Sequence, residues 1–171
     1  MATLDLTCVT IRPLGPDDSL EELTELLHRA YRKLAEMGLK YLATHQTVDI
    51  TRKRISHSKC FVAVYDGRIV GTINYNPKET AHGSPWYERP DVAKLTQMGV
   101  EPELHGCGLG RMLMDHAEAA ARADGAAELA MDTAETAHHL IEWYARRGYR
   151  FIEYVDWDVT NYRSVVMSKT L

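Results

Sequence analysis

The stretch that decides the fold is Val100-Glu-Pro-Glu-Leu-His-Gly-Cys-Gly-Leu-Gly110. It follows an apolar run from Lys94 that predicts a strand, and it precedes a spacing of apolar residues that predicts a helix from Leu109 to Asp124. Its three glycines let main-chain N–H groups converge without a Cβ between them, and the start of the helix adds the positive end of a dipole. The turn therefore suits a phosphate or pyrophosphate, although three glycines alone are equally consistent with a tight strand-to-helix turn.

Two familiar phosphate-binding loops do not fit this stretch. The Walker pattern needs Lys followed by Ser or Thr after its last glycine, whereas Gly110 is followed by Arg111 and Met112. The dinucleotide pattern places glycines at positions one, three and six, and here they stand at one, three and five. Both nucleotide interpretations are weakened, and another phosphate-bearing ligand is favoured.

The segments on either side predict one mixed sheet with helices. Asp66-Gly67 between two apolar runs predicts an antiparallel hairpin, whereas the strand, helix, strand order around Gly110 and Gly125 predicts a parallel step. Asp18 with Glu21 predicts a capped helix start. The predicted order is strand, two helices, three strands, helix, strand, helix and two strands: Leu6–Pro13, Asp18–Met37, Val48–Ser56, Cys60–Tyr65, Arg68–Tyr75, Lys94–Val100, Leu109–Asp124, Glu128–Asp132, Thr136–Arg147, Phe151–Val159 and Ser164–Lys169.

Composition sets the class of protein. With 171 residues, of which 45% are hydrophobic, the chain is expected to form a single domain over residues 1–171. A formal net charge of −4 argues against a nucleic-acid partner held by phosphate contacts. No apolar run reaches the ~20 residues of a membrane span, and three scattered cysteines indicate no disulfide framework. We expect a soluble, cytoplasmic protein that has neither a membrane nor a nucleic-acid partner.

Two motifs together carry a family resemblance. Gly99-Val100-Glu101-Pro102 followed by His105-Gly-Cys-Gly-Leu-Gly110 resembles the acyl-CoA pyrophosphate loop of the GNAT superfamily of acetyl-CoA-dependent N-acetyltransferases. Leu140-Ile-Glu-Trp-Tyr-Ala-Arg-Arg-Gly-Tyr149 is similar to the second signature of that family, and the element order agrees over almost the whole chain. The resemblance implies an α/β fold with a mixed sheet that splays apart at the acyl-CoA site. It is also compatible with a homodimer as the oligomeric state.

The resemblance also implies the site residues. His105 stands where the family has Arg or Gln, and Thr136 stands where many relatives carry an asparagine, so these two side-chain contacts differ from the family pattern. Acetyl-CoA is expected as co-substrate, with pantetheine paired to the strand end and the pyrophosphate held by main-chain amides. The implied cofactor residues are Met98, Gly99, Val100, His105, Gly106, Cys107, Gly108, Leu109, Gly110, Arg111 and Thr136.

The implied chemistry is direct attack of an amine on the thioester in a ternary complex. The N–H of Val100 is the donor that the family aims at the thioester carbonyl, and Tyr144 matches the tyrosine that protonates the departing thiolate. Cys107 as a ping-pong nucleophile is disfavoured, because no positioned base except His105 is apparent nearby. His138 and His139 are adjacent on a helix and cannot face one metal, so no metal site is expected.

The general base and the acceptor are left open by the sequence. Lys94 falls near the position at which some relatives place a glutamate. We expect a small-molecule amine as acceptor, either a small amine or an aminoglycoside-like polyamine. The alternatives are acetylation of protein lysines or N-termini, a non-catalytic acyl-CoA-binding module and a small nucleotide-binding regulator. An aromatic and acidic pocket for a cation is conceivable from Trp86, Tyr87, Tyr154 and Trp157 with Glu88, Asp91, Glu153, Asp156 and Asp158.

Overall fold

The structure is a computed structural model that describes residues 3–171. Helices and strands follow one another in almost the predicted order within these residues, with one short 3-10 turn before the first strand and two more between later elements. The elements are β1 (Thr10–Pro13), α1 (Leu20–Ala30), α2 (Arg32–Glu36), α3 (Val48–Ile55), β2 (Lys59–Tyr65), β3 (Arg68–Asn76), β4 (Val92–Val100), α4 (Leu109–Ala123), β5 (Glu128–Ala134), α5 (His138–Arg146), β6 (Arg150–Asp156) and β7 (Arg163–Thr170).

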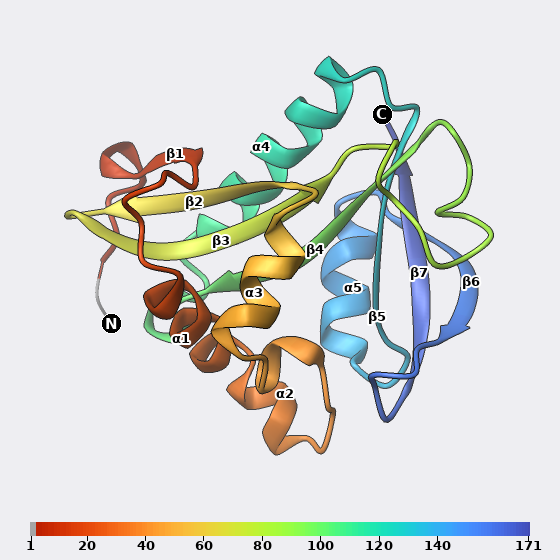
Figure 1. Cartoon of the computed structure of the whole chain (residues 1–171), viewed down its shortest axis with the longest axis horizontal. Helices are drawn as coiled ribbons and strands as arrows, with labels where there is room; N and C mark the ends of the chain where they lie inside the picture. Colours follow the sequence, from red (N-terminus) through yellow and green to blue (C-terminus); the bar gives the residue numbers. More distant parts are fainter. Residues whose placement is uncertain (1–2) are drawn as a thin grey trace.

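The strands form one mixed seven-stranded sheet in the order β1-β2-β3-β4-β5-β7-β6 (Figure 1). In the described part of the chain, the β4·β5 pair alone is parallel, and the other neighbouring pairs are antiparallel. This arrangement confirms the predicted α/β fold with a mixed sheet. The hairpin prediction is also confirmed, because Asp66 and Gly67 both take the positive φ values, 50° and 72°, that a two-residue turn of this kind requires.

The sheet is split between β4 and β5. These strands pair only from Val92 opposite Glu128 to Lys94 opposite Ala130, so the rest of β4 has no strand neighbour on that side. A β-bulge near Gln97, whose φ is 52°, displaces β4 further where it faces β3. The structure thus has the splayed sheet that the resemblance implied.

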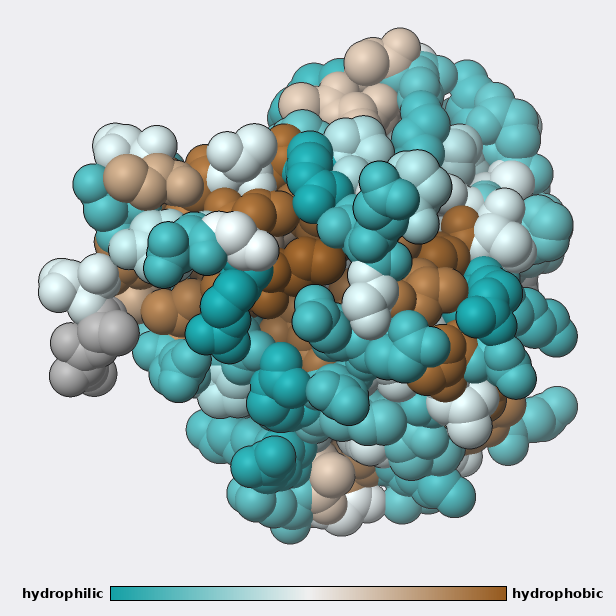
Figure 2. Space-filling model, turned by 60° about the vertical axis from the view of Figure 1, so that its left-hand side comes forward, coloured by the Kyte–Doolittle hydropathy of each residue, from teal (hydrophilic) through white to brown (hydrophobic). Residues whose placement is uncertain are grey.

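Helices cover both faces of the sheet. A Cβ added to Gly99 would lie 3.1 Å from Ala30 of α1, whereas one added to Gly71 would lie 3.0 Å from Leu113 of α4. In Figure 1, α1 to α3 lie in front of the sheet and α4 lies behind it. The largest apolar cluster packs α4 and part of α5 against β2 to β5 and β7. Hydrophilic residues cover most of the side of the molecule shown in Figure 2, and hydrophobic residues show in the gaps between them.

The start of the first helix differs from the prediction. Its N-cap is Ser19, whose hydroxyl accepts a hydrogen bond from the Glu22 N–H at 3.1 Å. Asp18, predicted as the cap, instead forms a bidentate ion pair with Arg12 and accepts from the Gly15 N–H. The Asp18 carboxylate is therefore occupied by the Arg12 guanidinium and the Gly15 N–H, and it does not cap the helix.

Other boundaries also differ. The first strand begins only at Thr10, because a 3-10 turn capped by Asp5 occupies Leu6–Cys8. The helix predicted to reach Met37 is interrupted at Tyr31, so that α1 and α2 are separate. The strand predicted to run to Val159 ends at Asp156. The two strand differences lie at element ends, where assignments commonly shift by a residue or two, whereas the break at Tyr31 divides one predicted helix into two.

Candidate active site

A cavity of about 750 Å³ occupies the split between β4 and β5. One end is bounded by the glycine turn before α4, and the free edge of β4 from Lys94 to Val100 lines its length. The other end is lined by α3, by the segment from Tyr41 to Ala43 and by the connection between β6 and β7. The cavity therefore runs from the predicted phosphate loop to a separate group of aromatic and charged side chains.

The N-terminus of α4 leaves main-chain donors free at the first end of the cavity. Its N-cap is Gly108, with φ 91°, and no side chain among residues 3–171 caps the helix. The first intrahelical bond runs from the Met112 N–H to the Gly108 carbonyl at 3.1 Å, so the amides before Met112 lack helical partners. Gly106 also has a positive φ, 80°, and a Cβ there would meet no atom within 4 Å. Uncapped amides at a helix N-terminus suit an anionic ligand.

The peptide group of Val100 faces the split. The N–H of Glu101 donates to the Val70 carbonyl at 2.9 Å, which makes the adjacent pair of Val100 and Gly71 the non-hydrogen-bonded pair of this antiparallel ladder. The N–H and C=O of Val100 therefore point away from β3. Nε2 of His105 lies 3.1 Å from the Val100 carbonyl oxygen, so the imidazole donates to it and closes the start of the loop.

Tyr144 of α5 reaches across the split to β4. Its hydroxyl donates to the thioether sulfur of Met98 at 3.9 Å, and its ring lies edge-on to those of Trp143 and Tyr149 at 5.0 and 5.8 Å. Burial raises the pKa of Tyr144, so the phenol is protonated at neutral pH. A thioether is a weak acceptor, and the hydroxyl is therefore available to a stronger one in the cavity.

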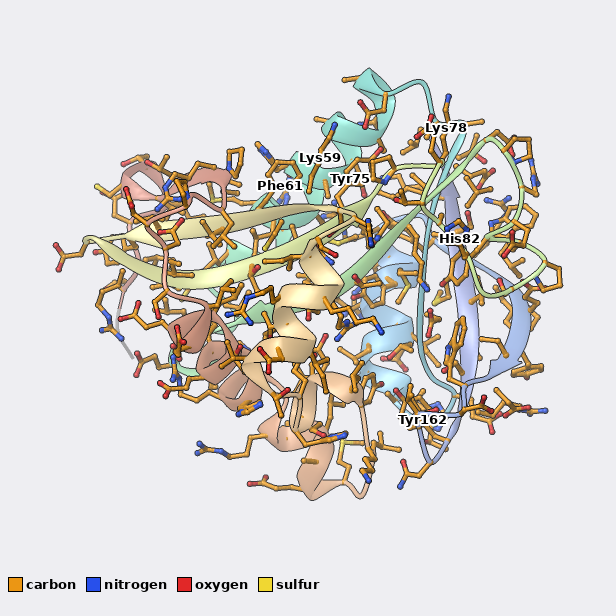
Figure 3. The ribbon with its side chains drawn as sticks, viewed as in Figure 1. Lys59, Phe61, Tyr75, Lys78, His82 and Tyr162 are labelled. Atoms are coloured by element: carbon orange, nitrogen blue, oxygen red, sulfur yellow. The ribbon has the colours of Figure 1, made fainter. Side chains whose placement is uncertain are left out.

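Three tyrosines form an aromatic wall near the other end of the cavity. The Tyr41 ring lies 5.6 Å from that of Tyr31 and 4.8 Å from that of Tyr162. The Tyr41 hydroxyl lies 2.7 Å from the Thr133 hydroxyl and accepts from the Ala134 N–H at 3.0 Å, so it occupies part of the unpaired edge of β5. Figure 3 shows Tyr162 at the lower end of the sheet, beside the connection that leads into β7.

Lys94 is enclosed by aromatic rings at the point where β4 and β5 separate. Its ammonium lies 4.3 Å from the Tyr87 ring centroid, 4.9 Å from that of Trp157 and 4.0 Å from Oδ1 of Asp132. Asp132 accepts from the Tyr87 hydroxyl at 2.7 Å and from Nε1 of Trp157 at 2.9 Å. Burial lowers the pKa of Lys94, and Arg54 lowers it further, whereas Asp132 acts in the opposite direction.

Arg54 is a second cation in this part of the cavity. Its Nη1 donates to Oε1 of Gln46 at 2.7 Å, and among residues 3–171 no Asp or Glu forms an ion pair with it. Gln46 is fully buried and is itself held by Thr51 and Gln97. The guanidinium is therefore positioned by a neutral amide, and within residues 3–171 the nearby Asp132 does not form an ion pair with it.

The structure brings most of the predicted site residues to one cavity. The predicted residues that line it are Met98, Gly99, Val100, His105, Gly106, Gly108, Gly110, Arg111 and Tyr144. Cys107 does not line it, Leu109 is buried in the apolar core, and Thr136 is exposed in the turn before α5. Near the start of α5, the cavity wall is lined by Thr133 and His139 and not by Thr136.

The acidic side chains proposed for a cation pocket lie elsewhere. Asp91 pairs with Arg89, Glu88 accepts from the Gly83 N–H and Glu153 accepts from the Trp86 N–H, and none of these carboxylates lines the cavity. Asp156 and Asp158 do not line it either. The aromatic rings already have cations of the chain beside them: Arg89 over Trp86, Lys94 over Tyr87 and Trp157, and Arg163 over Tyr154. This part of the prediction is not supported by the geometry.

Sequence reasoning missed several lining residues of the second end, namely Tyr31, Tyr41, Arg54, Asp132 and Tyr162. They come from five separate segments, and none belongs to a local motif. The sequence identifies Asp132 only as the end of a predicted strand. The signal that could have found it is a polar side chain late in a strand at the edge of a split sheet.

Comparisons with known proteins agree with this architecture. Residues 20–149 match the Acetyltransferase (GNAT) family. An S-(2-succino)cysteine N-acetyltransferase of Bacillus subtilis (strain 168) is 30% identical over 141 residues, which cover 80% of this chain and 81% of that protein. The chain therefore belongs to the GNAT acetyltransferase family, and it is an acetyl-CoA-dependent N-acetyltransferase with acetyl-CoA as co-substrate.

Solved structures show the same fold. An acetyltransferase from Streptococcus agalactiae 2603 superposes with a TM-score of 0.74 at 18% identity, covering 97% of this chain and 100% of that one. A GNAT family acetyltransferase from Elizabethkingia anophelis, solved with acetyl-CoA bound, gives 0.68 at 14% identity, covering 96% and 99%. Within residues 3–171, no group of three or more His, Cys, Asp or Glu side chains could hold a metal ion, and no helix is both long and apolar enough to cross a bilayer.

Proposed function

We propose that this enzyme transfers the acetyl group of acetyl-CoA to a primary amine of a small molecule by direct attack in a ternary complex. One observation carries the proposal: a single cavity joins the uncapped start of α4, the free edge of β4 and the hydroxyl of Tyr144. A cofactor and an acceptor could meet there from opposite ends. The Bacillus relative supports a small acceptor, since its name gives a modified amino acid as substrate.

In this proposal the cofactor lies along the split, with its pyrophosphate at the start of α4 and its pantetheine beside β4. The amides of the turn from Gly106 to Arg111, apart from that of Cys107, which donates to the Leu104 carbonyl at 3.4 Å, hold the pyrophosphate, with the Arg111 side chain beside it. Pantetheine takes the place of a strand against Met98, Gly99 and Val100, which lack a strand neighbour on the β5 side. Thr136 has no part in this arrangement, because its side chain is exposed in the turn before α5.

The acetyl transfer then uses two groups of the chain. The neutral amine attacks the thioester carbonyl, and the N–H of Val100, which faces the split, stabilises the oxygen as it gains charge. As the C–S bond breaks, the electron pair goes to sulfur, and Tyr144 donates its proton to the thiolate. The attacking nitrogen loses one proton as it becomes the amide, and this proton returns to the phenolate oxygen, so Tyr144 is restored. Burial raises the pKa of Tyr144, so the phenol still carries the proton that this step needs.

The kinetic mechanism and the acceptor class can be tested together. CoA-thiol release is measured with acetyl-CoA and a panel of amines: tyramine, spermidine, L-methionine, S-(2-succino)cysteine and a lysine-containing peptide. Varying both substrates should give intersecting initial-velocity lines, and Cys107→Ala should leave them unchanged. Parallel lines that depend on Cys107 would contradict direct attack.

The same panel separates the other functions. Exclusive acetylation of the peptide would indicate a protein acetyltransferase. Stabilisation by acetyl-CoA in a thermal-shift assay without thiol release for any amine would indicate a binding module, since a ligand at 100 times its Kd adds about 2.7 kcal/mol. Either outcome would contradict acetylation of a small amine.

A further inference from the structure

We propose that Arg54 and Lys94 form a carboxylate-binding subsite for the acceptor, so that the preferred acceptor is an amino acid or a related anionic amine. This inference rests on the proposed function and specifies its substrate class. The two cations line the same end of the cavity, opposite the phosphate loop. They belong to different elements, α3 and β4, and both side chains are largely withdrawn from solvent.

The charge balance of this end favours an anion. Asp132 is the one acidic side chain among the described lining residues of the cavity, and it faces two lining cations at this end, Arg54 and Lys94. Asp132 lies beside Lys94 and also accepts hydrogen bonds from Tyr87 and Trp157. One positive charge is therefore left without a partner in a partly desolvated wall. Such a charge is costly unless a ligand of opposite sign neutralises it.

Arg54 is positioned to meet that ligand. Among residues 3–171, a single side chain, Gln46, accepts a hydrogen bond from its guanidinium, which carries five N–H donors in a planar fork. Gln46 is held in turn by Thr51 and Gln97, so Arg54 is fixed in place before any ligand binds. A fixed guanidinium with unused donors matches the geometry of a carboxylate, which accepts two parallel hydrogen bonds.

The cations also explain why this end should not bind a polyamine. An acceptor with a second ammonium would bring a positive charge close to those of Arg54 and Lys94. The nearby rings of Tyr87 and Trp157 could not stabilise it, because the Lys94 ammonium already lies over both. For an amino acid, in contrast, neutralising the carboxylate removes the charge that favours protonation of the adjacent amine. The same two residues would therefore select the acceptor and help its amine reach the neutral form.

The test compares probes that differ in their carboxylates. L-Methionine and S-(2-succino)cysteine carry carboxylates, whereas L-methioninamide keeps the same amine and thioether without one. In the wild-type enzyme, kcat/KM for L-methionine or S-(2-succino)cysteine should exceed that for the amide. An amine beside an amide loses its proton more easily than one beside a carboxylate, so intrinsic reactivity alone would favour the amide.

Variants then assign the preference to residues. Arg54→Gln should lower kcat/KM for the carboxylate probes by about 10- to 100-fold and change that for L-methioninamide little, because only the former lose a charged hydrogen bond. Lys94→Met should act in the same direction. Arg52→Gln, an exposed change on the same helix, is the matched control and should leave all rates unchanged. The Kd of acetyl-CoA, measured for each variant, reports whether the cofactor end is intact.

The outcomes distinguish the two proposals. Acetylation of tyramine, spermidine or L-methioninamide in preference to both carboxylate probes would overturn the subsite and leave the proposed function in place. Equal losses for charged and uncharged probes in Arg54→Gln would also overturn it, since they indicate a structural role. If the variant fails to fold, the wild-type preference between acid and amide decides the question alone. Absence of acetylation with every amine would overturn the proposed function itself.

Discussion

Replacing Tyr144 with phenylalanine removes one hydroxyl from the reaction site and little else. The partner of that hydroxyl in the structure is the Met98 sulfur at 3.9 Å, a weak acceptor, so the free energy of unfolding should change by less than about 0.5 kcal/mol. The loss of a general acid should lower kcat by about 100- to 10,000-fold, which corresponds to about 2.7 to 5.5 kcal/mol in the barrier. The Kd of acetyl-CoA should stay within about twofold.

Tyr149 provides a control in the same aromatic cluster. Its hydroxyl donates to Oε1 of buried Glu118 at 3.1 Å, and Tyr149 does not line the cavity. Tyr149→Phe removes a hydrogen bond to a charged group, although Arg147 and Lys169 still pair with Glu118. We expect a loss of about 1 to 2 kcal/mol in stability, a Tm lower by about 2 to 8 °C, and an unchanged kcat.

Single-turnover experiments with saturating acetyl-CoA and amine measure the chemical step separately from product release. Because burial raises the pKa of Tyr144, the phenol stays protonated through the range from pH 6 to 10, and the ratio of wild-type to Tyr144→Phe rates should be constant there. A wild-type single-turnover rate in Tyr144→Phe would refute the acid role. A rate lost in parallel with thermal stability, as in a misfolded variant, would refute it as well.

Three further changes test other parts of the structure. Gly108→Asp places a side chain at φ 91° and a negative charge at the predicted phosphate site, so acetyl-CoA affinity should fall at least 100-fold in a calorimetric titration, and retained affinity would contradict the loop's role. Glu101→Gln leaves Arg29 without its buried carboxylate and should cost about 1 to 3 kcal/mol in chemical denaturation, whereas Glu103→Gln, on the surface, should cost nothing measurable. Burial lowers the pKa of His116, so the unfolded chain binds its proton more readily and stability should fall as the pH drops below about 6.5. His116→Gln should flatten that dependence in pH-resolved melts, and an unchanged slope would contradict it.

The fold could be predicted from local patterns wherever those patterns are unambiguous. Asp66-Gly67 requires a hairpin, and the glycines around Leu109 require a turn into a helix, so both appear where the sequence indicated. The residues that differed, such as Asp18, have a choice of partners. A carboxylate can cap a helix or pair with Arg12, and only the tertiary arrangement decides between these.

The site divides in the same way. Its proposed phosphate end consists of consecutive residues in one turn, so a local motif is enough to predict it. The opposite end is assembled from side chains far apart in the chain, such as Arg54 and Asp132, which meet only because the sheet splits. No spacing in the sequence indicates that these side chains line one cavity. The acidic and aromatic residues predicted to form a cation pocket are close together along the chain, and most of them lie outside the cavity.

A structure of the enzyme crystallised with acetyl-CoA tests the central claim most directly. We predict the pyrophosphate on the main-chain amides of the turn from Gly106 to Arg111, pantetheine along β4 from Met98 to Val100, and the thioester sulfur within hydrogen-bond distance of the Tyr144 hydroxyl. Clear density for the cofactor outside the split between β4 and β5, with that turn empty, would contradict the account.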